Sequence, residues 1–571
     1  MRLTFSRFRE YTTVTVPWTM ESQIVELKLN RSLLDPHFDG YKLSLDQLPV
    51  YNIENPDGVC LTSIQDNQYS FQQVKLFSRH NNLHADRYYD NVVYFVNDKL
   101  DIEQLVVKKD ERPRKTRIVH TISDSARHES SSRYNVTIDF PAKDWAILSD
   151  GAGKFWVLNT GNRLKLSEWK VSYRGFPLGE GVSFAIHHCC HHLSANGHHV
   201  IDALLLHVEE TTQEVEGVTF VSVLEWVTFV KGDDETWTLK RVRRLKGRSI
   251  PDYVCLTDNA TAVYISSDKP YTVVYDSMNP VEERVEKQEE TLKDAEKHPL
   301  YTWSQTDDEV NVQFTVPERC GKADLDVRLS MSAFHFGLKN STAFLSGDLQ
   351  APIKVDESTW TIDGQRVEIP DYQALATDRT GKLVVNADPD KPVVFSNQDM
   401  EEVDAFPEDT ALLVRIDGES HVASHQASLS SNQWLFNVDL PSSASRALCL
   451  RHDVDGLLWQ PDSDSAQFRH VATFNALGYV QASKQQLQYA ACAADRSFVA
   501  LCDCARHVYV YWQAVAVKTE FRNRKSGADV KNVAKQQVVS LDSADEIVGF
   551  RVTNEWIFVL TAKSLSALKV V

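Results

Sequence analysis

The stretch Glu309-Val310-Asn311-Val312-Gln313-Phe314-Thr315-Val316-Pro317 decides the fold of the middle of the chain, because its apolar residues recur at every second position. A period of two places alternate side chains on opposite faces of a β-strand. The same alternation returns in residues 325–329 and 334–338, and shorter strand-like runs follow at 344–345, 353–355, 359–362 and 367–369. Roughly six or seven half-buried strands without a convincing helix predict a compact antiparallel β-sandwich over residues 299–385.

Outside this module, short aliphatic strands end in an Asp-containing turn and lead into strands rich in aromatic and β-branched residues. Residues 146–151 lead into 155–158, residues 254–259 into 262–265, and residues 498–503 into 508–511. Near-continuous apolar strands at regular spacing are typical of sheets buried on both faces, as in β-propeller blades. We therefore predict an all-β protein, an irregular β-propeller of about seven or eight blades interrupted by an inserted β-sandwich. Stacked sandwich domains are the alternative.

The two ends of the chain supply strands that can close such a ring. Three strand-like runs finish the sequence, and residues 24–29 near its beginning form a strand without an evident partner. Because a closed ring has no open edge, a last blade that lacks one strand can take it from the N-terminal part of the chain. The expected organisation is a first propeller part over residues 1–278 and a second over residues 386–571.

A change of pattern separates the first propeller part from the sandwich. Residues 279–298 begin with Asn-Pro and continue as a run rich in Glu and Lys. These are strong helix formers, and the few apolar residues among them are too sparse to bury a face. We predict an acidic, solvated helical linker.

The composition sets broad limits on the class of protein. The chain has 571 residues, 42% hydrophobic and 25% charged, which is ordinary for a soluble protein of roughly two to four domains. A formal charge of −18 disfavours direct binding to nucleic acid or anionic membranes, because the long-range field repels a polyanion. The scattered cysteines do not suggest a disulfide framework, and no secretory leader or bilayer-spanning run is expected. We expect a monomer in the cytoplasm and nucleus, without membrane contact.

The sequence His187-His188-Cys189-Cys190-His191-His192 is the strongest candidate for metal chemistry. Asn196-Gly197 after it predicts a two-residue hairpin, which would pair His191 with Asp202. One face would then carry residue types that bind zinc: His187, Cys189, His191, His198 and Asp202. Ligands that neighbour one another on one strand converge poorly on a tetrahedral ion, and apolar residues share the same face. We therefore expect ordinary packing and no metal.

Two basic runs, residues 108–117 and 240–248, stand out in this acidic chain. The second alternates partly with apolar residues and predicts a charged edge strand, which would discourage pairing between molecules. The first begins a polar tract, from about residue 108 to residue 133, that predicts a long exposed loop. A nuclear-import signal or a contact in an RNA–protein assembly is the functional alternative for both.

No catalytic motif is complete. Gly151-Ala152-Gly153-Lys154 lacks the first Gly and the closing Ser or Thr of a phosphate loop, and it predicts a turn. The sequence has neither a nucleophile elbow nor the paired histidines of a zinc-protease helix. We therefore expect no enzyme activity and no cofactor. The alternative is an active site in the propeller channel, built from His, Asp or Arg residues of several blades.

The residues of the sandwich resemble those of a known family. Tyr301-Thr302-Trp303-Ser304-Gln305-Thr306, followed by a strand that ends at Pro317, is similar to the opening of the CS domain in NudC-type proteins. Residues 336–339, 344–349 and 357–362 (FGLK, FLSGDL and ESTWTI) match the family in the same order. One departure follows Ile369, where Pro370-Asp371-Tyr372 replaces the Lys and Trp pattern that usually closes the module. The chain thus resembles the NudC family, with its CS domain inserted mid-chain.

The resemblance implies a non-enzymatic adaptor or co-chaperone that helps fold, stabilise or scaffold partner proteins. In the family, several CS domains dock on heat-shock protein 90, and NudC relatives assist β-propeller clients. The residues that match the family's strands give the candidate partner-binding set: Tyr301, Trp303, Gln305, Thr306, Lys339 and Trp360. For the two tryptophans a place in the core is the alternative, and for the polar residues a solvated surface. A structural subunit of a transport or RNA-processing assembly is a further alternative for the whole protein.

Overall fold

The computed structural model contains two compact units, a propeller unit and a sandwich unit. The propeller unit is described over residues 23–25, 27–35, 38–108, 111–128, 130, 132–165, 168–215, 218–281, 411–429, 432–441, 443–462, 466–484, 486–522 and 529–570. The sandwich unit is described over residues 301–305, 309–315, 325–329, 333–339, 343–348, 361–363 and 366–372. The predicted helical linker falls almost entirely outside these residues.

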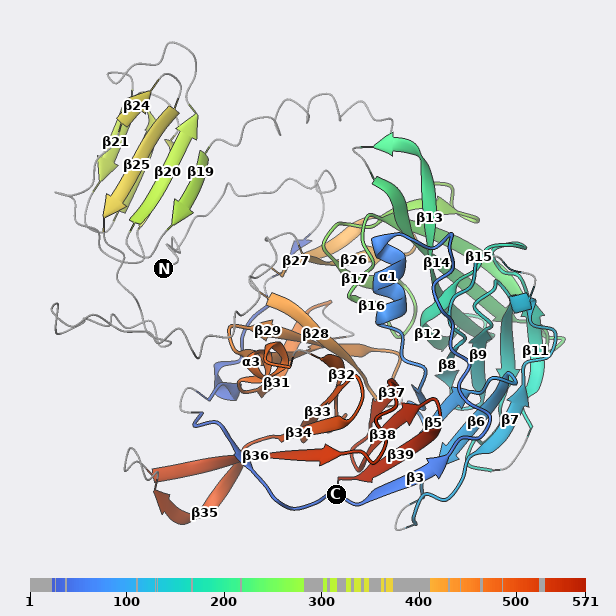
Figure 1. The fold of residues 1–571 in the computed structure, drawn as a ribbon. Helices are drawn as coiled ribbons and strands as arrows, with labels where there is room; N and C mark the ends of the chain where they lie inside the picture. Colours follow the sequence, from blue (N-terminus) through green and yellow to red (C-terminus); the bar gives the residue numbers. More distant parts are fainter. Residues whose placement is uncertain are drawn as a thin grey trace. The chain divides into compact units, whose positions relative to one another are not determined.

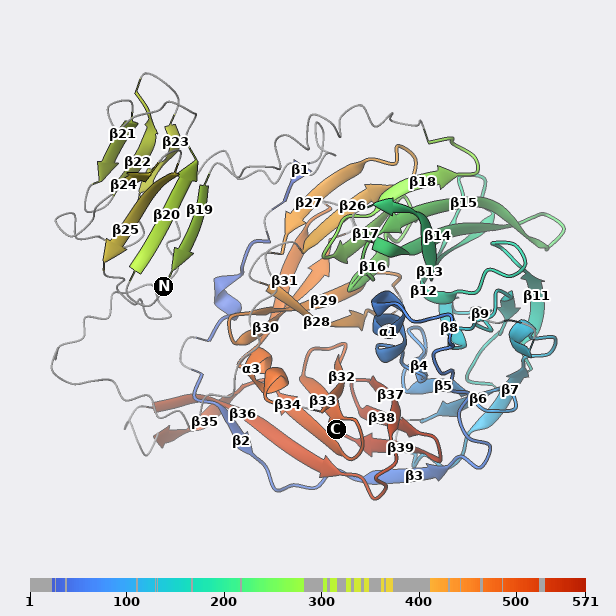
Figure 2. The ribbon, with the colours of Figure 1, turned by 45° about the horizontal axis from the view of Figure 1, so that its top comes forward.

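Seven sheets, the blades, surround a common axis in the described part of the propeller unit (Figures 1 and 2). Blade 1 contains β4 (His84–Ala85), β5 (Val92–Val96), β6 (Asp101–Val106) and β7 (Arg117–Thr121). Blade 2 contains β8 (Thr137–Ala142), β9 (Trp145–Ser149), β10 (Phe155–Asn159) and β11 (Lys170–Gly175). Blade 3 contains β12 (Ala185–Leu193), β13 (His199–Val215), β14 (Val218–Lys231), β15 (Trp237–Gly247) and β18 (Thr272–Asp276).

The ring continues across the insertion. Blade 4 contains β16 (Tyr253–Leu256), β17 (Ala262–Ser267), β26 (Leu412–Asp417), β27 (Ala423–Ser428) and β1 (Gln23–Ile24). Blade 5 contains β28 (Asn432–Asp439), β29 (Arg446–His452), β30 (Asp455–Pro461) and β31 (Phe468–Phe474). Blade 6 contains β32 (Leu487–Cys492), β33 (Phe498–Asp503), β34 (His507–Trp512), β36 (Asp529–Ser540), β35 (Val515–Arg522) and β2 (Tyr41–Leu43). Blade 7 contains β37 (Ile547–Val552), β38 (Trp556–Thr561), β39 (Ser564–Lys569) and β3 (Val50–Glu54).

The blades bury both faces of their central strands, as the apolar runs predicted. Every residue of β5, β9 and β38 is buried. The apolar clusters lie between neighbouring blades: one joins Val92 and Ile102 of blade 1 to Leu148 and Trp156 of blade 2. Neighbouring first strands, such as β8 with β12 and β28 with β32, contact one another around the axis. These innermost strands therefore line the channel. The predicted all-β propeller is confirmed, with seven blades.

Ring closure uses an N-terminal strand, as predicted, but a different one from residues 24–29. β3 pairs antiparallel with β39 from Val50 opposite Leu568 to Glu54 opposite Ser564, and so completes blade 7. β1, which contains Ile24, instead pairs parallel with β27 at the outer edge of blade 4. β2 likewise pairs parallel with β36 in blade 6. The N-terminal segment thus fastens three blades.

Substituting Ile53→Asp should weaken ring closure strongly. Ile53 is 5% exposed and packs in the apolar cluster that joins blades 7 and 1, so a carboxylate there is buried without a partner. We expect a loss of about 3 kcal/mol or more in the free energy of unfolding, measured by urea titration. Glu54→Thr, on the exposed face of the same strand, is the matched control. Equal stability of the two variants would contradict closure by β3.

The insertion interrupts blade 4 between its second and third strands. β17 and β26 pair antiparallel along their full lengths, from Ala262 opposite Asp417 to Ser267 opposite Leu412. Between β17 and the insertion the chain first adds β18 to the edge of blade 3, next to β15. The sheet of blade 4 is therefore continuous, even though more than a hundred residues separate β17 from β26 in the sequence.

The sandwich unit consists of two antiparallel sheets. One has the order β19 (Tyr301–Gln305), β20 (Glu309–Thr315), β25 (Arg366–Tyr372), β24 (Thr361–Asp363), and the other is β21 (Leu325–Leu329), β22 (Ala333–Leu338), β23 (Ala343–Asp348). This confirms the predicted β-sandwich fold of the insertion.

Short helices complete the propeller unit: η1 (Arg31–Leu33), α1 (Phe71–Ser78), η2 (Ala126–His128) and α3 (Leu477–Ala482). α1 begins with a capping box between Ser70 and Gln73. The helix lies near the centre of the ring in Figure 2. Lys75 and Arg79 pair with Asp252 of blade 4 at 3.0 and 2.5 Å, and Arg79 also lies 4.6 Å from the ring centroid of Trp434 in blade 5. α1 thus covers one mouth of the channel.

Candidate functional site: the sandwich strands and the axial channel

Three of the predicted partner-binding residues lie together on one strand. Tyr301, Trp303 and Gln305 alternate along β19, an edge strand of its sheet, opposite Phe314, Val312 and Val310 of β20. Lys339 is exposed and follows β22 in the other sheet. Thr306 and Trp360 lie outside the described residues. The proposed set is therefore divided between two sheets.

The atypical closing segment of the sandwich still forms a strand. β25 pairs with β20 from Arg366 opposite Thr315 to Tyr372 opposite Glu309, so Pro370 lies opposite Asn311. The other neighbour, β24, pairs only as far as Glu368. Pro370 thus occupies a part of β25 with one described neighbour, where its missing N–H is tolerated.

Charged and histidine side chains from several blades converge around the propeller axis, and we call this set the axial cluster. Arg87 Nη2 lies 2.6 Å from Asp139 Oδ1, which joins blades 1 and 2. Arg446 Nε lies 2.6 Å from Asp439 Oδ1, and Arg446 Nη1 donates to His187 O of blade 3 at 2.8 Å. Arg551 of blade 7 donates from Nε to Leu83 O of blade 1 at 2.8 Å. The cluster comprises His80, His84, Arg87, Asp139, His187, Asp439, Arg446 and Arg551.

The histidines of the axial cluster are neutral at physiological pH. Burial, together with nearby arginines, lowers the pKa of His80 and His187 to about 4 each. Burial, followed by the proximity of His80, lowers the pKa of His84 to about 3. The carboxyls, by contrast, are held in their charged form. Burial alone would raise the pKa values of Asp139 and Asp439, but the nearby Arg87 and Arg446 lower them. The cluster therefore holds charged ion pairs beside neutral imidazoles.

His188 joins three blades through both ring nitrogens. Leu256 N of blade 4 donates to Nδ1 at 3.2 Å, so Nδ1 is the acceptor and Nε2 carries the proton. Nε2 then donates to Ala444 O, between β28 and β29 of blade 5, at 2.7 Å. The side chain is fully buried, and burial lowers its pKa well below the ordinary value. This histidine is fixed in one neutral tautomer.

The chemistry of the axial cluster suits binding better than proton transfer. A general base works best with a pKa near the operating pH, whereas the pKa values of these imidazoles lie well below it. The neighbouring thiols of Cys189, Cys190 and Cys255 have pKa values raised by burial, so they are poor nucleophiles. What the cluster offers is a set of hydrogen-bond donors held in place by their contacts.

The residues of the axial cluster could not be identified from the sequence. The sequence predicts only that an enzyme site in the channel would need His, Asp or Arg residues from several blades. Its members come from five blades and are separated by up to several hundred residues. One usable signal exists: Asp139, Asp439 and Arg551 are single charges within otherwise apolar or neutral innermost strands. Such a charge in a buried strand must find a partner.

The histidine hairpin differs in register from the prediction. Ser194 N donates to His198 O and Gly197 N to Ser194 O, so the turn contains three residues instead of two. Gly197 has a φ of 81°, as such a turn requires. Asp202 consequently lies opposite Cys190 and not opposite His191. Among the described residues, no three His, Cys, Asp or Glu side chains converge as metal ligands.

The basic run at residues 240–248 is not an edge strand, so that prediction is wrong. β15 pairs with β14 on one side and β18 on the other. Arg241 is buried with Asp276, at 2.6 Å, and also pairs with Glu419. Arg243 is 6% exposed at the side chain, with Trp226 stacked 4.0 Å from its guanidinium carbon. The alternation of charge and apolar residues reflects buried ion pairs, which sequence alone cannot distinguish from a solvated face.

The basic tract at residues 108–133 is also more structured than an exposed loop. It contains β7 and η2, and Arg127 is 7% exposed. Arg127 Nη1 donates to Tyr134 O at 3.0 Å and to Asp150 O at 2.8 Å. The guanidinium of Arg127 is therefore engaged in contacts within the protein and does not form part of an exposed basic surface.

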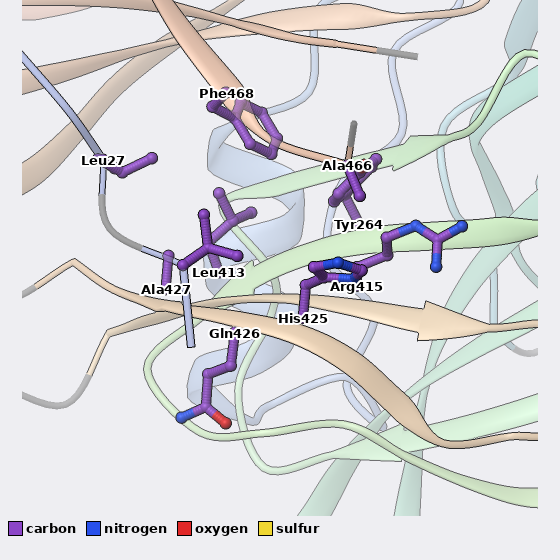
Figure 3. Close-up of a pocket in the computed structure, with 10 residues that line it drawn as sticks. Leu27, Tyr264, Leu413, Arg415, His425, Gln426, Ala427, Ala466 and Phe468 are labelled. Carbon is purple, nitrogen blue, oxygen red and sulfur yellow. The ribbon is translucent and has the colours of Figure 1, made fainter. Parts of the chain in front are cut away.

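A small pocket lies at the outer side of blades 4 and 5 (Figure 3). Val25 and Leu27 of the N-terminal segment form one wall, and Phe468 of blade 5 another. Its polar groups are partly engaged, since Arg415 Nη1 donates to Ser424 Oγ at 2.7 Å. The remaining lining residues are Tyr264, Leu413, His425, Gln426, Ala427 and Ala466. We interpret it as the seam where the N-terminal segment packs on the ring.

Two further observations concern the described residues. None of their helices has both the length and the hydropathy needed to cross a bilayer. Eight described cysteines have free thiols: Cys60, Cys189, Cys190, Cys255, Cys449, Cys492, Cys502 and Cys504.

Comparisons with known proteins find a family for the sandwich residues and relatives for nearly the whole chain. Residues 299–370 match the CS domain family. NudC domain-containing protein 1 from Mus musculus is 35% identical over 588 residues, which cover 96% of this chain and 99% of that protein. The chain belongs to the NudC domain-containing protein 1 family. The Xenopus tropicalis member is 34% identical over 591 residues, with the same coverage. The crystal structure of Saccharomyces cerevisiae Sqt1 is 11% identical, covers 86% of this chain and 99% of its own, and has a TM-score of 0.31.

Proposed function

We propose that this member of the NudC domain-containing protein 1 family is a non-enzymatic adaptor or co-chaperone. It would bind partner proteins through two surfaces, one on the CS domain and one on the propeller. The carrying observation is the CS domain match at residues 299–370, set between β17 and β26 of a closed ring. Two modules on one chain raise the effective concentration of whatever each of them binds.

The partners that we propose are a chaperone of the heat-shock protein 90 type and β-propeller clients, met in the cytoplasm and nucleus. The electrostatics of the axial channel support a non-catalytic role, because its imidazoles are held neutral and its thiols protonated. A structural subunit of a larger assembly is distinguished from a co-chaperone by whether client folding changes when the chain is removed.

Affinity purification of the full chain at native abundance tests this proposal. Lys339→Glu reverses the charge of an exposed residue after β22 of the CS domain, and Lys143→Glu does the same between β8 and β9 of the propeller. We expect the first variant to recover several-fold less of the chaperone, since a like charge at an interface costs about 1 kcal/mol or more, and the second to match the unsubstituted chain. Recovery of client propellers should survive Lys339→Glu if the propeller holds them separately.

Two results would overturn the proposal. One is the absence of both chaperone and client from the purified material. The other is an equal effect of the two charge reversals, because the CS domain surface would then have no special part in recruitment.

A further inference from the structure

The axial cluster contains one more cation than its ion pairs use. Arg87 and Arg446 each have a carboxylate at 2.6 Å, whereas Arg551 pairs with no carboxylate among the described residues. The hydrogen bond from its Nε to Leu83 O fixes the guanidinium and leaves both terminal nitrogens without a described partner. With neutral imidazoles, three guanidiniums face two carboxylates, so the cluster carries one net positive charge inside an acidic protein.

Histidines with unused ring nitrogens lie beside Arg551. His84 follows directly on Leu83, is 8% exposed, and makes no hydrogen bond through its ring to any described residue. His80 Nε2 is buried and also lacks a described partner, and the two ring centroids are 6.3 Å apart. A buried polar atom without a partner is costly and calls for an explanation by water or a ligand. His80 Nε2 carries this cost at the junction between blades 7 and 1, beside the terminal nitrogens of Arg551, which have no described partner.

We propose that Arg551, His80 and His84 form a binding site for a carboxylate group in the axial channel. The two terminal nitrogens of a guanidinium match the two oxygens of a carboxylate, and the single excess charge matches a monoanion. The neutral imidazole of His84 has one N–H to donate to a further lone pair of those oxygens. His80 also hydrogen-bonds to the Asn82 side chain, and its unpartnered Nε2 faces the ligand as a donor once the ring is protonated. The site is independent of the proposed CS-domain function.

The site couples binding to proton uptake. A bound anion favours the protonated form of a neighbouring imidazole, so it raises the pKa of His80 and His84 from their depressed positions. The charge of Asp139, which stays ionised, reinforces this direction at His84, whereas the charge of Arg551 opposes it at both histidines. Binding should therefore tighten as the pH falls from 7.5 to 6.5, and protons should enter the protein when the ligand binds.

Isothermal titration of the full chain tests the site with three probes: acetate, a peptide with blocked ends and one glutamate, and inorganic phosphate. Titration in buffers with different ionisation enthalpies measures the proton uptake. Acetate binding identifies a free organic acid as the source of the carboxylate, and binding of the peptide alone identifies a protein side chain. Both outcomes support the proposal if Arg551→Gln weakens the affinity by roughly tenfold or more, as for a lost hydrogen bond to a charged group.

Arg174→Gln is the matched control, because Arg174 is an exposed arginine outside the channel, and it should leave the affinity unchanged. If Arg551→Gln does not fold, His84→Gln replaces it, with an expected loss of a few-fold in affinity and a smaller proton uptake. The proposal fails if neither carboxylate binds, if phosphate binds as tightly as the carboxylates, or if the folded channel variant binds as well as the control.

Discussion

Asp86→Ala is expected to lower the free energy of unfolding by about 3–5 kcal/mol, because it leaves a buried guanidinium without its anion. Arg163 Nε lies 2.6 Å from Asp86 Oδ2, its Nη2 donates to Oδ1 at 3.0 Å, and both side chains have no exposure. The same carboxylate accepts from Tyr94 Oη at 3.1 Å. The measurement is urea unfolding followed by tryptophan fluorescence.

Two further variants separate the mechanism from a general loss of packing. The double variant Asp86→Ala with Arg163→Met removes the charge that the single variant strands, and it should recover part of the lost stability. Asp124→Ala breaks the exposed pair with Arg174 and should cost less than about 1 kcal/mol. If the double variant has a lower free energy of unfolding than Asp86→Ala, the unpaired charge of Arg163 is not the cause of the lost stability.

Acid is expected to unfold the propeller from about pH 6.5 downward, well above the range in which its carboxyls titrate. His80, His84, His187 and His188 have folded-state pKa values below the ordinary value because they are buried. Below about pH 6.5 the unfolded chain binds protons at these positions and the folded chain does not, so stability falls as the pH falls. Each histidine lowers the free energy of unfolding by up to about 1.4 kcal/mol per pH unit. The combined effect of four histidines is therefore large compared with the free energy of unfolding of a typical protein.

The test is the melting temperature between pH 7.5 and pH 5. Replacing His84 and His187 with Gln removes two of the titrating groups and should flatten the pH dependence. His452→Gln, at the β29–β30 turn, is the comparison variant. A constant melting temperature across this range, or an equal slope in both variants, would contradict neutral axial histidines. Asp139 and Asp439 cannot mask the effect, because lowered carboxyl pKa values withdraw stability only at lower pH.

Local patterns predicted most of the fold. Runs such as Val92–Val96 and Trp156–Leu158 are apolar throughout because both faces of a blade are covered, and this requirement is visible in the sequence. The closing strand was harder, since residues 24–29 and Val50–Glu54 both look like edge strands. Only the pairing of Val50–Glu54 with β39 decides between them. A difference of one residue in a turn likewise displaced Asp202 from the predicted face of the histidine hairpin.

The charged positions were predicted least well. Arg241 and Arg243 alternate with apolar residues in the way that solvated edge strands do, and their acidic partners lie on β13, β18 and the turn after β26. The axial cluster is similar in part. Asp139 meets Arg87 only once blades 1 and 2 are arranged around the axis, whereas Asp439 and Arg446 lie directly opposite each other in the β28–β29 hairpin.

The pairing of β3 with β39 also has a consequence for synthesis on the ribosome. Val50 emerges more than 500 residues before its partner Leu568, so blade 7 cannot form until β39 has been translated. The nascent chain therefore carries an unpaired strand edge throughout that interval, when misassembly and aggregation are most dangerous. A nonsense mutation before β39 would leave that edge permanently open, and such a product should be a target for degradation and not a partly active protein.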